Sequence, residues 1–245
     1  MLHNKRGDNN IRGKMSKILI ISDLHEPYSH TDSFAFIEAI KKQYKPDRVV
    51  CIGDELDYHA LSFHDSDPDL PNASKELELG IYKIKMIEKL FPKMDLLHSN
   101  HGSMVYRKRK HHGFPSLAVK DYADILGVDK QKWRWHDRLI IKDKYGEYYF
   151  CHNMNKDPVK SSMSIGMNFI QGHYHTDFRI GYWSSPENLR WGMNVGCLID
   201  KDSLAFAYSK VNIRRPVLGC GMIINGVPHL IPMILKRGNR WVRQL

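Results

Sequence analysis

The chain has 245 residues, and its 37 Lys and Arg against 27 Asp and Glu give a formal charge of +10 with neutral histidines. Its 42% hydrophobic and 11% aromatic residues can bury a sizeable core, which excludes disorder, collagen and coiled coil as the main state. No apolar run approaches the roughly 18 residues of a membrane span, and the charged N-terminus lacks a signal-peptide segment. Four cysteines without a CxxC pair do not make a disulfide scaffold. We therefore expect a soluble, cytoplasmic protein with no membrane partner; the sequence specifies no oligomeric state.

Positive charge is concentrated in two segments. Residues 107–110 are four consecutive cations, and residues 203–245 carry seven Lys or Arg and no acidic residue. Such clusters can bind a polyanion such as nucleic acid, or they can be solvated surface that keeps the protein in solution. Composition alone leaves both interpretations open.

The chain begins with a polar segment and then a strand. Residues 1–14 are unpatterned, so we expect a flexible N-terminal extension before a single domain over residues 15–245. Residues 17–22 form a short, continuous, β-branched run, which is typical of a strand covered on both faces. This strand ends in a loop that carries Asp23 and His25.

A helix and a second strand follow. Residues 33–44 place their apolar side chains on one stripe, and Thr31 or Asp32 can cap this helix. Residues 48–52 predict a strand that also ends in a polar loop, residues 53–57.

The alternation of strand and helix then continues. Residues 74–91 show helical periodicity, and residues 94–98 predict a third strand that ends before Asn100 and His101. After a further helix over residues 116–126, short strands are predicted at 139–141, 148–151, 168–171, 191–195, 204–208, 218–224 and 230–235. This order predicts an α/β fold with two sheets and a site at the carboxyl ends of the strands.

The ends of five predicted strands carry side chains that can ligate metals: Asp23 and His25, Asp54, Asn100 and His101, His152, and His173 with His175. One histidine at the end of a strand is most often an ordinary surface or core residue. Five such ends in succession predict a metal site, because carboxylate and imidazole suit Zn, Fe and Mn.

These residues occur in ordered motifs. Asp23-Leu24-His25, Gly53-Asp54-Glu55-Leu56-Asp57, Asn100-His101, His152 and Gly172-His173-Tyr174-His175 resemble the DxH, GDxxD, GNH(D/E), H and GHxH motifs of the calcineurin-like metallophosphoesterase superfamily. The resemblance covers residues 17–175. It implies a four-layer α-β-β-α sandwich with two facing mixed β-sheets and a dinuclear metal site at the strand ends. It also implies a hydrolase that cleaves phosphate esters with a metal-bridging hydroxide.

The resemblance further implies two divalent metal ions, Mn, Fe or Zn with Mn favoured. One ion would be held by Asp23, His25 and His175, and the other by Asn100, His152 and His173. Asp54 would bridge the two ions. His101 would be the catalytic residue that protonates the leaving oxygen, because the pKa of imidazole lies near neutrality.

The third motif departs from the family pattern. It reads Ser99-Asn100-His101-Gly102, whereas the family usually has Gly before Asn and an acidic residue after His. In the family that acidic residue orients the histidine, so its absence affects the expected efficiency of His101 and not the metal site, unless another acid substitutes from a distance. Asp57 and Asp65 are both candidates.

The surroundings of the motifs bear on the substrate. The cluster Arg107, Lys108, Arg109 and Lys110 begins six residues after His101, and we expect it on a loop at the rim of the site, where it would bind substrate. Nearby aromatic residues, including Tyr106, Phe114 and Trp133, can stack on unpaired bases or can belong to the core. These features favour a nuclease that acts on nucleic-acid phosphodiesters.

Three alternatives remain open. One is a phosphomonoesterase acting on nucleotides. Another is a phosphoprotein phosphatase, which is disfavoured because Glu26 and Tyr58 stand where that branch usually has the Gly of DxHG and the Arg of GDxxDRG. The last is a non-catalytic module that binds a polyanion and retains the fold.

Overall fold

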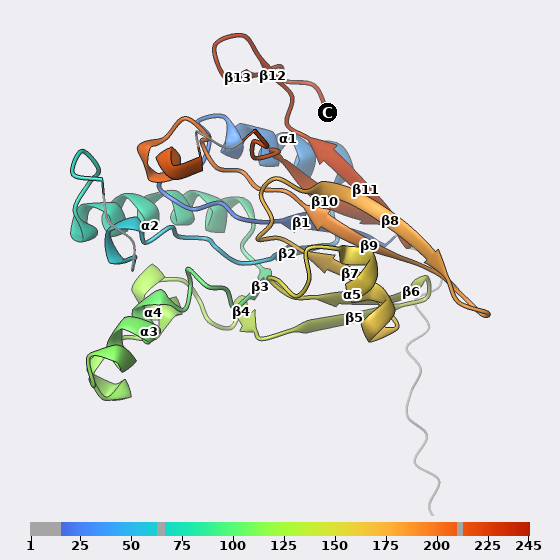
Figure 1. Cartoon of the computed structure of the whole chain (residues 1–245), viewed down its shortest axis with the longest axis horizontal. Coiled ribbons are helices and arrows are strands. Elements are labelled where there is room, and N and C mark those ends of the chain that lie inside the picture. The colour runs from blue at the N-terminus through green and yellow to red at the C-terminus, as the bar shows by residue number, and fades with distance from the viewer. Residues whose placement is uncertain (1–15, 63–66, 210–212) are drawn as a thin grey trace, which may run out of the picture.

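The computed structural model describes residues 16–62, 67–209 and 213–245, so the expected extension over residues 1–14 lies outside the described part. Two β-sheets form the centre of the molecule (Figure 1). The first has the strand order β11-β10-β1-β2-β3-β4 and the second has the order β5-β6-β7-β9-β8. Both are mixed, because parallel pairs such as β1 with β2 and β6 with β7 stand beside antiparallel pairs such as β10 with β11 and β8 with β9.

The strands of the first sheet are β1 (Lys17–Ile21), β2 (Arg48–Cys51), β3 (Met94–Leu97), β4 (Trp133–His136), β10 (Gly219–Ile224) and β11 (Val227–Pro232). Those of the second are β5 (Leu139–Asp143), β6 (Gly146–Phe150), β7 (Asn168–Gln171), β8 (Phe178–Ser184) and β9 (Leu189–Val195). The helices are α1 (Ser33–Tyr44), α2 (Ala73–Leu90), α3 (Met104–His111), α4 (Tyr122–Leu126) and α5 (Pro158–Ile165), with short 3-10 turns η1 (His59–Leu61), η2 (Ser116–Ala118) and η3 (Leu204–Ser209).

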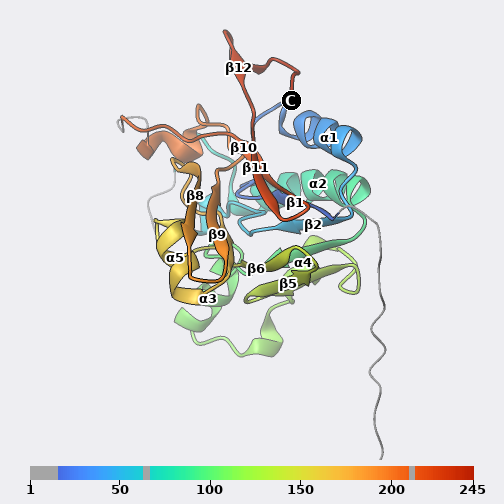
Figure 2. The same ribbon diagram turned by 90° about the vertical axis from the view of Figure 1, so that its right-hand side faces the viewer.

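The layers follow from the alternation of side chains along each strand. On β1, Leu19 and Ile21 belong to the core that lies under α1 and α2, whereas Ile18 and Ile20 belong to the core between the two sheets. Figure 2 shows α1 and α2 beside the first sheet and α5 beside the second. Each fully buried aliphatic side chain contributes about 1.5–3 kcal/mol. The expected α/β fold with two mixed sheets is confirmed.

Several predicted elements agree closely with the structure. Helix α1 has the predicted bounds, β2 and β3 each end one residue earlier than predicted, and α2 is shifted by one residue toward the N-terminus. All four cysteines are buried and free. No helix in the described ranges is both long and apolar enough to cross a membrane.

Other predictions were wrong. Residues 116–126 do not form one helix, because the extended backbone at Val119 and Asp121 separates η2 from α4. Residues 204–208 lie in η3 rather than in a strand, and the backbone N–H of Phe206 donates to the carbonyl oxygen of Ser203 at 3.1 Å, which closes a turn. The basic cluster lies on helix α3 and not on a loop.

The cap of α1 also differs from its prediction. Asp32 stands at the N-cap position but makes no capping hydrogen bond. Its carboxylate instead accepts hydrogen bonds from the guanidinium of Arg240, at 2.6 and 2.7 Å, and from the backbone N–H of Trp241 at 3.0 Å. These bonds fix the C-terminal hairpin of β12 (Leu235–Lys236) and β13 (Arg240–Trp241) to the start of α1.

Candidate metal centre

The loops that follow β1, β2, β3, β6 and β7 bring the predicted ligands together. These strands run parallel within their sheets, so their carboxyl ends lie along the same edges. The seven side chains that meet there are Asp23, His25, Asp54, Asn100, His152, His173 and His175. Their role as metal ligands stays a prediction.

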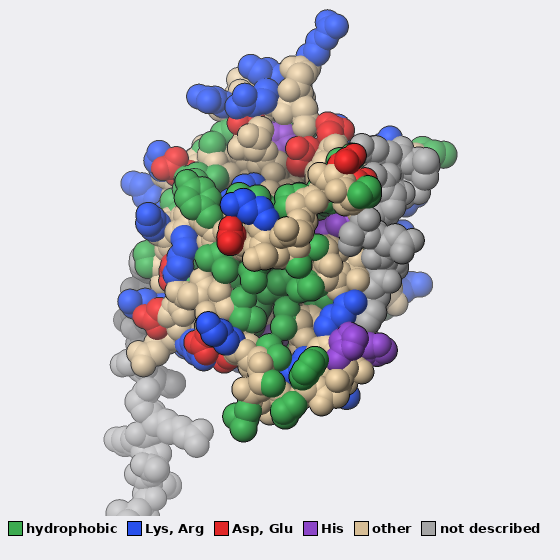
Figure 3. All heavy atoms as spheres, turned by 90° about the vertical axis from the view of Figure 1, so that its left-hand side faces the viewer, with side chains coloured by type: hydrophobic (Ala, Val, Ile, Leu, Met, Phe, Trp, Pro, Cys, Tyr) green, Lys and Arg blue, Asp and Glu red, His purple; other side chains and the backbone are tan. Residues whose placement is uncertain are grey.

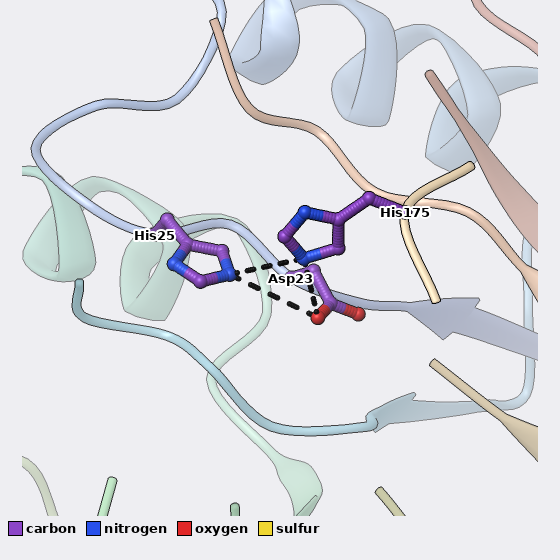
Figure 4. Close-up of side chains that lie close together, drawn as sticks. All are labelled: Asp23, His25 and His175. Carbon is purple, nitrogen blue, oxygen red and sulfur yellow. Dashed lines mark hydrogen bonds and ion pairs between the residues drawn. The ribbon is translucent and has the colours of Figure 1, made fainter. Parts of the chain in front are cut away.

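Three of these side chains form a first group (Figure 4). Nε2 of His175 lies 3.1 Å from Oδ1 of Asp23, and Nε2 of His25 lies 3.8 Å from the same oxygen. The two imidazole Nε2 atoms are 3.3 Å apart. The nitrogen and oxygen lone pairs of these side chains therefore converge on one small volume.

A second group lies next to the first and consists of Asp54, His152 and His173, with Asn100 beside them. Nε2 of His152 is 2.7 Å from Oδ1 of Asn100 and 3.2 Å from Nδ1 of His173. Oδ2 of Asp54 lies 3.3 Å from Nε2 of His152 and 3.5 Å from Nε2 of His25. Asp54 thus stands between the two groups, where a bridging carboxylate would be needed.

Two of the histidines are oriented by partners on their far side. Nδ1 of His152 lies 2.8 Å from the carbonyl oxygen of Ile52, which can only accept, so Nδ1 carries the proton. Nδ1 of His25 lies 2.5 Å from Oδ1 of Asp57. In both rings Nε2 faces the centre and, in the neutral imidazole, carries the lone pair that a metal-binding histidine needs.

The backbone of these loops is unusual. Four of the predicted ligands have left-handed φ angles: Asp23 at 50°, His25 at 50°, Asp54 at 52° and His173 at 64°. Such conformations cost free energy in residues other than glycine, and they persist where surrounding contacts fix them, often at functional sites. Gly172 permits the close approach of two loops, because a Cβ at this position would collide with Oγ of Ser22 and Oδ2 of Asp23.

The electrostatics of the centre also suit cations. Burial alone would raise the pKa of Asp23, but hydrogen bonds with His175 and His25 hold it well below its usual range. Burial would also raise the pKa of Asp54, but the charge of His152 and its hydrogen bond to Asp54 hold this pKa well below its usual range. In turn, the charge of Asp54 raises the pKa of His152 to about 9, although burial of the ring opposes this. Within the described ranges, no Lys or Arg forms an ion pair with either carboxylate. Two buried carboxylates balanced only by imidazoles, with amide oxygen nearby, fit a site for divalent metal ions.

Comparison with known families decides the class of this centre. Residues 16–193 match the family model of the calcineurin-like phosphoesterases. The chain belongs to this family. It is therefore a hydrolase that acts on phosphate esters, and the resemblance carried by the sequence motifs is confirmed.

The solved structures that match this phosphoesterase share little sequence with it. An archaeal phosphodiesterase is 13% identical, with a TM-score of 0.47 over 88% of this chain and 99% of the other. The phosphoesterase YfcE from E. coli is 11% identical, with a TM-score of 0.44 over 94% and 98% of the two chains. Vacuolar protein sorting 29 from Cryptosporidium parvum is 13% identical, with a TM-score of 0.42 over 89% and 96%. The curated proteins contain no significant match to the chain.

The phosphoesterase places His101 at the edge of the metal centre. Its backbone N–H donates to Oδ1 of Asp54 at 3.0 Å, and its Nδ1 donates to the carbonyl oxygen of Asp57. Oδ1 of Asp57 is 3.7 Å from the same nitrogen. Burial of the ring and the charge of His25 lower the pKa of His101. The backbone carbonyl of Asp57 therefore orients His101, while the carboxylate of Asp57 bonds His25. The other candidate acid, Asp65, lies outside the described residues.

A hollow of about 390 Å³ opens over the two ligand groups, and we call it the metal hollow. Its lining includes His101 and also Phe206 and Arg214, which the motifs did not indicate. The ring of Phe206 packs edge-on against His25, with 5.6 Å between the ring centroids. Arg214 had been visible in the sequence only as one member of the acid-free C-terminal segment.

The predicted substrate-binding cluster lies beside this hollow and not in its lining. Helix α3, which carries Arg107, Lys108, Arg109 and Lys110, begins three residues after His101. Nη2 of Arg107 donates to the carbonyl oxygen of Asn100 at 2.7 Å, which connects the helix to the loop after β3 that carries Asn100. None of the four lines the metal hollow in the part of the chain that the structure describes.

Proposed function

We propose that this phosphoesterase is a metal-dependent nuclease that hydrolyses phosphodiester bonds of nucleic acid. The observation that carries the proposal is the position of the basic helix α3, which continues from the loop bearing Asn100 and His101. The hydrogen bond from Arg107 to the carbonyl oxygen of Asn100 holds the start of this basic helix beside the loop that carries the predicted ligand. A polynucleotide bound at the centre would place further phosphates near Lys110 and its neighbours.

Two divalent ions would be held by the seven predicted ligands. Bound there, they would supply the positive charge that polarises a phosphoryl group and activates water near neutral pH. Asp23, Asp54 and Asn100 offer oxygen atoms, which suit Mn, and imidazole suits Fe and Zn as well. We favour Mn for this reason.

The chain's own residues would order the reaction. Asp57 and the carbonyl oxygen of Ile52 hold His25 and His152 with their Nε2 atoms toward the centre. Because Nδ1 of His101 donates to the carbonyl of Asp57, Nε2 is the nitrogen through which His101 would pass a proton to the leaving oxygen. Arg214, in the wall of the metal hollow, would bind a non-bridging phosphate oxygen.

A substrate panel tests the proposal. The metal-loaded protein is incubated with single-stranded DNA, duplex DNA, RNA, mononucleotides and a phosphopeptide, and the products are analysed. Cleavage of at least one polynucleotide into shorter fragments is expected. Release of phosphate from mononucleotides or the phosphopeptide alone would overturn the nuclease assignment.

The salt dependence of binding provides a second test with a matched control. Lys110→Ala removes an exposed cation from α3, and Lys236→Ala removes an exposed cation from the distant hairpin strand β12. If nucleic acid follows α3, Lys110→Ala lowers the slope of log K against log salt by about 0.7–0.9, and Lys236→Ala leaves the slope unchanged. Equal slopes for the two variants would remove α3 from the binding surface.

A phosphomonoesterase acting on nucleotides is the second candidate. The metal hollow favours it, because a volume of about 390 Å³ with Arg214 in its wall suits one terminal phosphate and a small leaving group. Arg214→Ala then raises KM for mononucleotides more than for polynucleotides, since a polymer keeps its other phosphate contacts. The same increase for both substrates would show that Arg214 does not distinguish them.

A further inference from the structure

A second and larger hollow of about 640 Å³ lies next to the metal hollow. Helix α3 forms one wall with Val105 and Tyr106, and the segment from η2 to α4 forms the opposite wall with Val119 and Tyr122. Its inner end reaches Gly102, the residue after His101. We call this hollow the α3 groove. Its volume lies in the range of small-molecule sites, and it begins one residue away from the predicted proton donor.

Exposed aromatic and apolar side chains lie in the groove and near its lining residues. Tyr106, which lines the groove, is 57% exposed. Phe114, on the loop after α3, is 57% exposed, and Leu117, on η2 next to the lining residue Ser116, is 99% exposed. Figure 3 shows hydrophobic side chains gathered in the lower half of this face, with Lys, Arg and His side chains next to them. Exposed apolar groups of this kind, rimmed by charge, mark surfaces that bind a partner.

The walls of the groove are fixed. Nη1 of Arg109 donates to the carbonyl oxygen of Phe114 at 2.8 Å, which ties the loop to α3. The hydroxyl of Tyr122 donates to buried Glu55 at 3.2 Å, and its ring packs edge-on against Trp135. A ligand would therefore meet a groove that is already formed.

The charges around the groove indicate what it binds. The guanidinium of Arg109 lies 4.8 Å from the ring centroid of Tyr106, and Lys120 also lines the groove. Asp121 is ion-paired with Lys130 at 3.0 Å, so it adds little net negative charge. Asp137 lines the groove as well and could accept a hydrogen bond from an exocyclic amino group. Aromatic faces combined with cations suit unpaired bases and their phosphates.

We propose that the α3 groove binds the unstacked bases of a single-stranded nucleic acid whose phosphodiester lies in the metal hollow. The proposal rests on the proposed nuclease function and adds a strand preference to it. In a duplex the bases are paired and stacked inside the helix, so they cannot enter an aromatic groove without unpairing. A single strand presents them directly.

Binding is measured apart from cleavage. A labelled single-stranded oligothymidylate with cleavage-resistant phosphorothioate links is titrated with the metal-loaded protein, and fluorescence anisotropy reports the Kd. Tyr106→Ala is expected to weaken binding by about 5-fold to 100-fold, because it removes one base-stacking ring. Tyr182→Ala is the matched control, since Tyr182 is 53% exposed but lies on β8 of the second sheet. The same label on a duplex is expected to show little difference between wild type and Tyr106→Ala.

The outcomes separate the two proposals. Equal single-strand affinity for wild type and Tyr106→Ala, or no binding at all, would overturn the groove assignment. Tight binding that depends on Tyr106, without cleavage of an ordinary strand, would overturn the nuclease function and leave the groove as a binding site. Light scattering adds a last check, because a dimer that Tyr106→Ala dissociates would assign this face to a second copy of the chain and contradict the proposal.

Discussion

The metal hollow and the α3 groove are neighbours, but they are built in opposite ways. The metal hollow is lined by loops whose ligands are mostly buried, have left-handed φ angles and are held by several hydrogen bonds. The groove is lined by α3 and by the segment from η2 to α4, and it includes side chains such as Tyr106 that are largely exposed. A reacting centre needs atoms fixed to fractions of an ångström, whereas substrate selection needs only a surface of suitable shape and charge. We therefore expect substitutions in the metal hollow to lower activity on every substrate, and substitutions in the groove to lower activity on polymeric substrates alone.

The largest expected effect comes from Asp54, which stands between the two ligand groups. Asp54→Asn keeps the shape of the side chain but removes a charge that would hold both ions. We expect activity to fall by more than about 100-fold, because loss of a group that only hydrogen-bonds to a metal ligand already costs about 10–100-fold. Metal-dependent hydrolysis of bis(p-nitrophenyl) phosphate and of oligonucleotides measures it.

Asp202→Asn is the control for this change, since Asp202 is 58% exposed in its side chain and belongs to neither hollow. Thermal melting confirms that both variants fold. Activity of Asp54→Asn close to wild type, on either substrate, would mean that the metal centre is misassigned.

His101 tests the chemistry at the edge of the metal hollow. His101→Ala should slow hydrolysis of an ordinary phosphodiester by about 10²–10⁴-fold, because an alkoxide leaving group needs a proton. An activated aryl ester should lose less, since its phenolate leaves without help. The kcat values of the two esters measure the difference, and His229→Ala, an exposed histidine on β11, is the control. Equal losses on both esters would argue against proton donation.

Asp57 acts through other residues, so its expected effect is smaller. Asp57→Ala removes the acceptor for Nδ1 of His25, and we expect metal affinity to fall by about 10–100-fold. Isothermal titration with Mn²⁺ measures this directly. Asp57→Asn retains an oxygen that can accept the same hydrogen bond, so it should recover much of the affinity. Unchanged affinity in Asp57→Ala would show that His25 is oriented without it.

The two hollows also differ in how well the sequence predicted them. The metal ligands could be identified because their residue types come at the ends of buried strands, and an apolar run such as 17–22 predicts a strand from its own composition. Helix α3 could not be predicted from the sequence, because Met104 is its one buried side chain and the helix therefore shows no apolar stripe. Lys108, Arg109 and Lys110 lie in its last turn, where they interact favourably with the helix dipole. The groove arises only when α3 packs near α4.

Long-range contacts account for other errors. Trp133 was a candidate for base stacking, yet it is 1% exposed and its Nε1 donates to the carbonyl oxygen of Phe91. Arg134, next to it, pairs with Asp95 on the neighbouring strand. Local sequence could not show these partners, which lie about 40 residues earlier in the chain. In this segment, therefore, Trp133 and Arg134 stabilise the first sheet, and their basic and aromatic character does not by itself indicate a nucleic-acid surface.

The smallest expected effect lies outside both hollows, at the ion pair of Asp32 with Arg240. The hydrogen bonds from Arg240, opposed by partial burial, hold the pKa of Asp32 well below its usual range. A carboxylate with a lowered folded-state pKa contributes stability above its unfolded pKa of about 3.9, and that stability is lost as the pH falls below it. Because the guanidinium is 55% exposed, solvent screens the pair, and Asp32→Asn should cost about 1 kcal/mol of unfolding free energy at pH 7. Urea unfolding should show this difference at pH 7 and a smaller one near pH 3, with kcat/KM unchanged on every substrate. A loss of activity in the folded variant would instead show that the hairpin of β12 and β13 influences the metal hollow, and that this ion pair has a functional as well as a structural role.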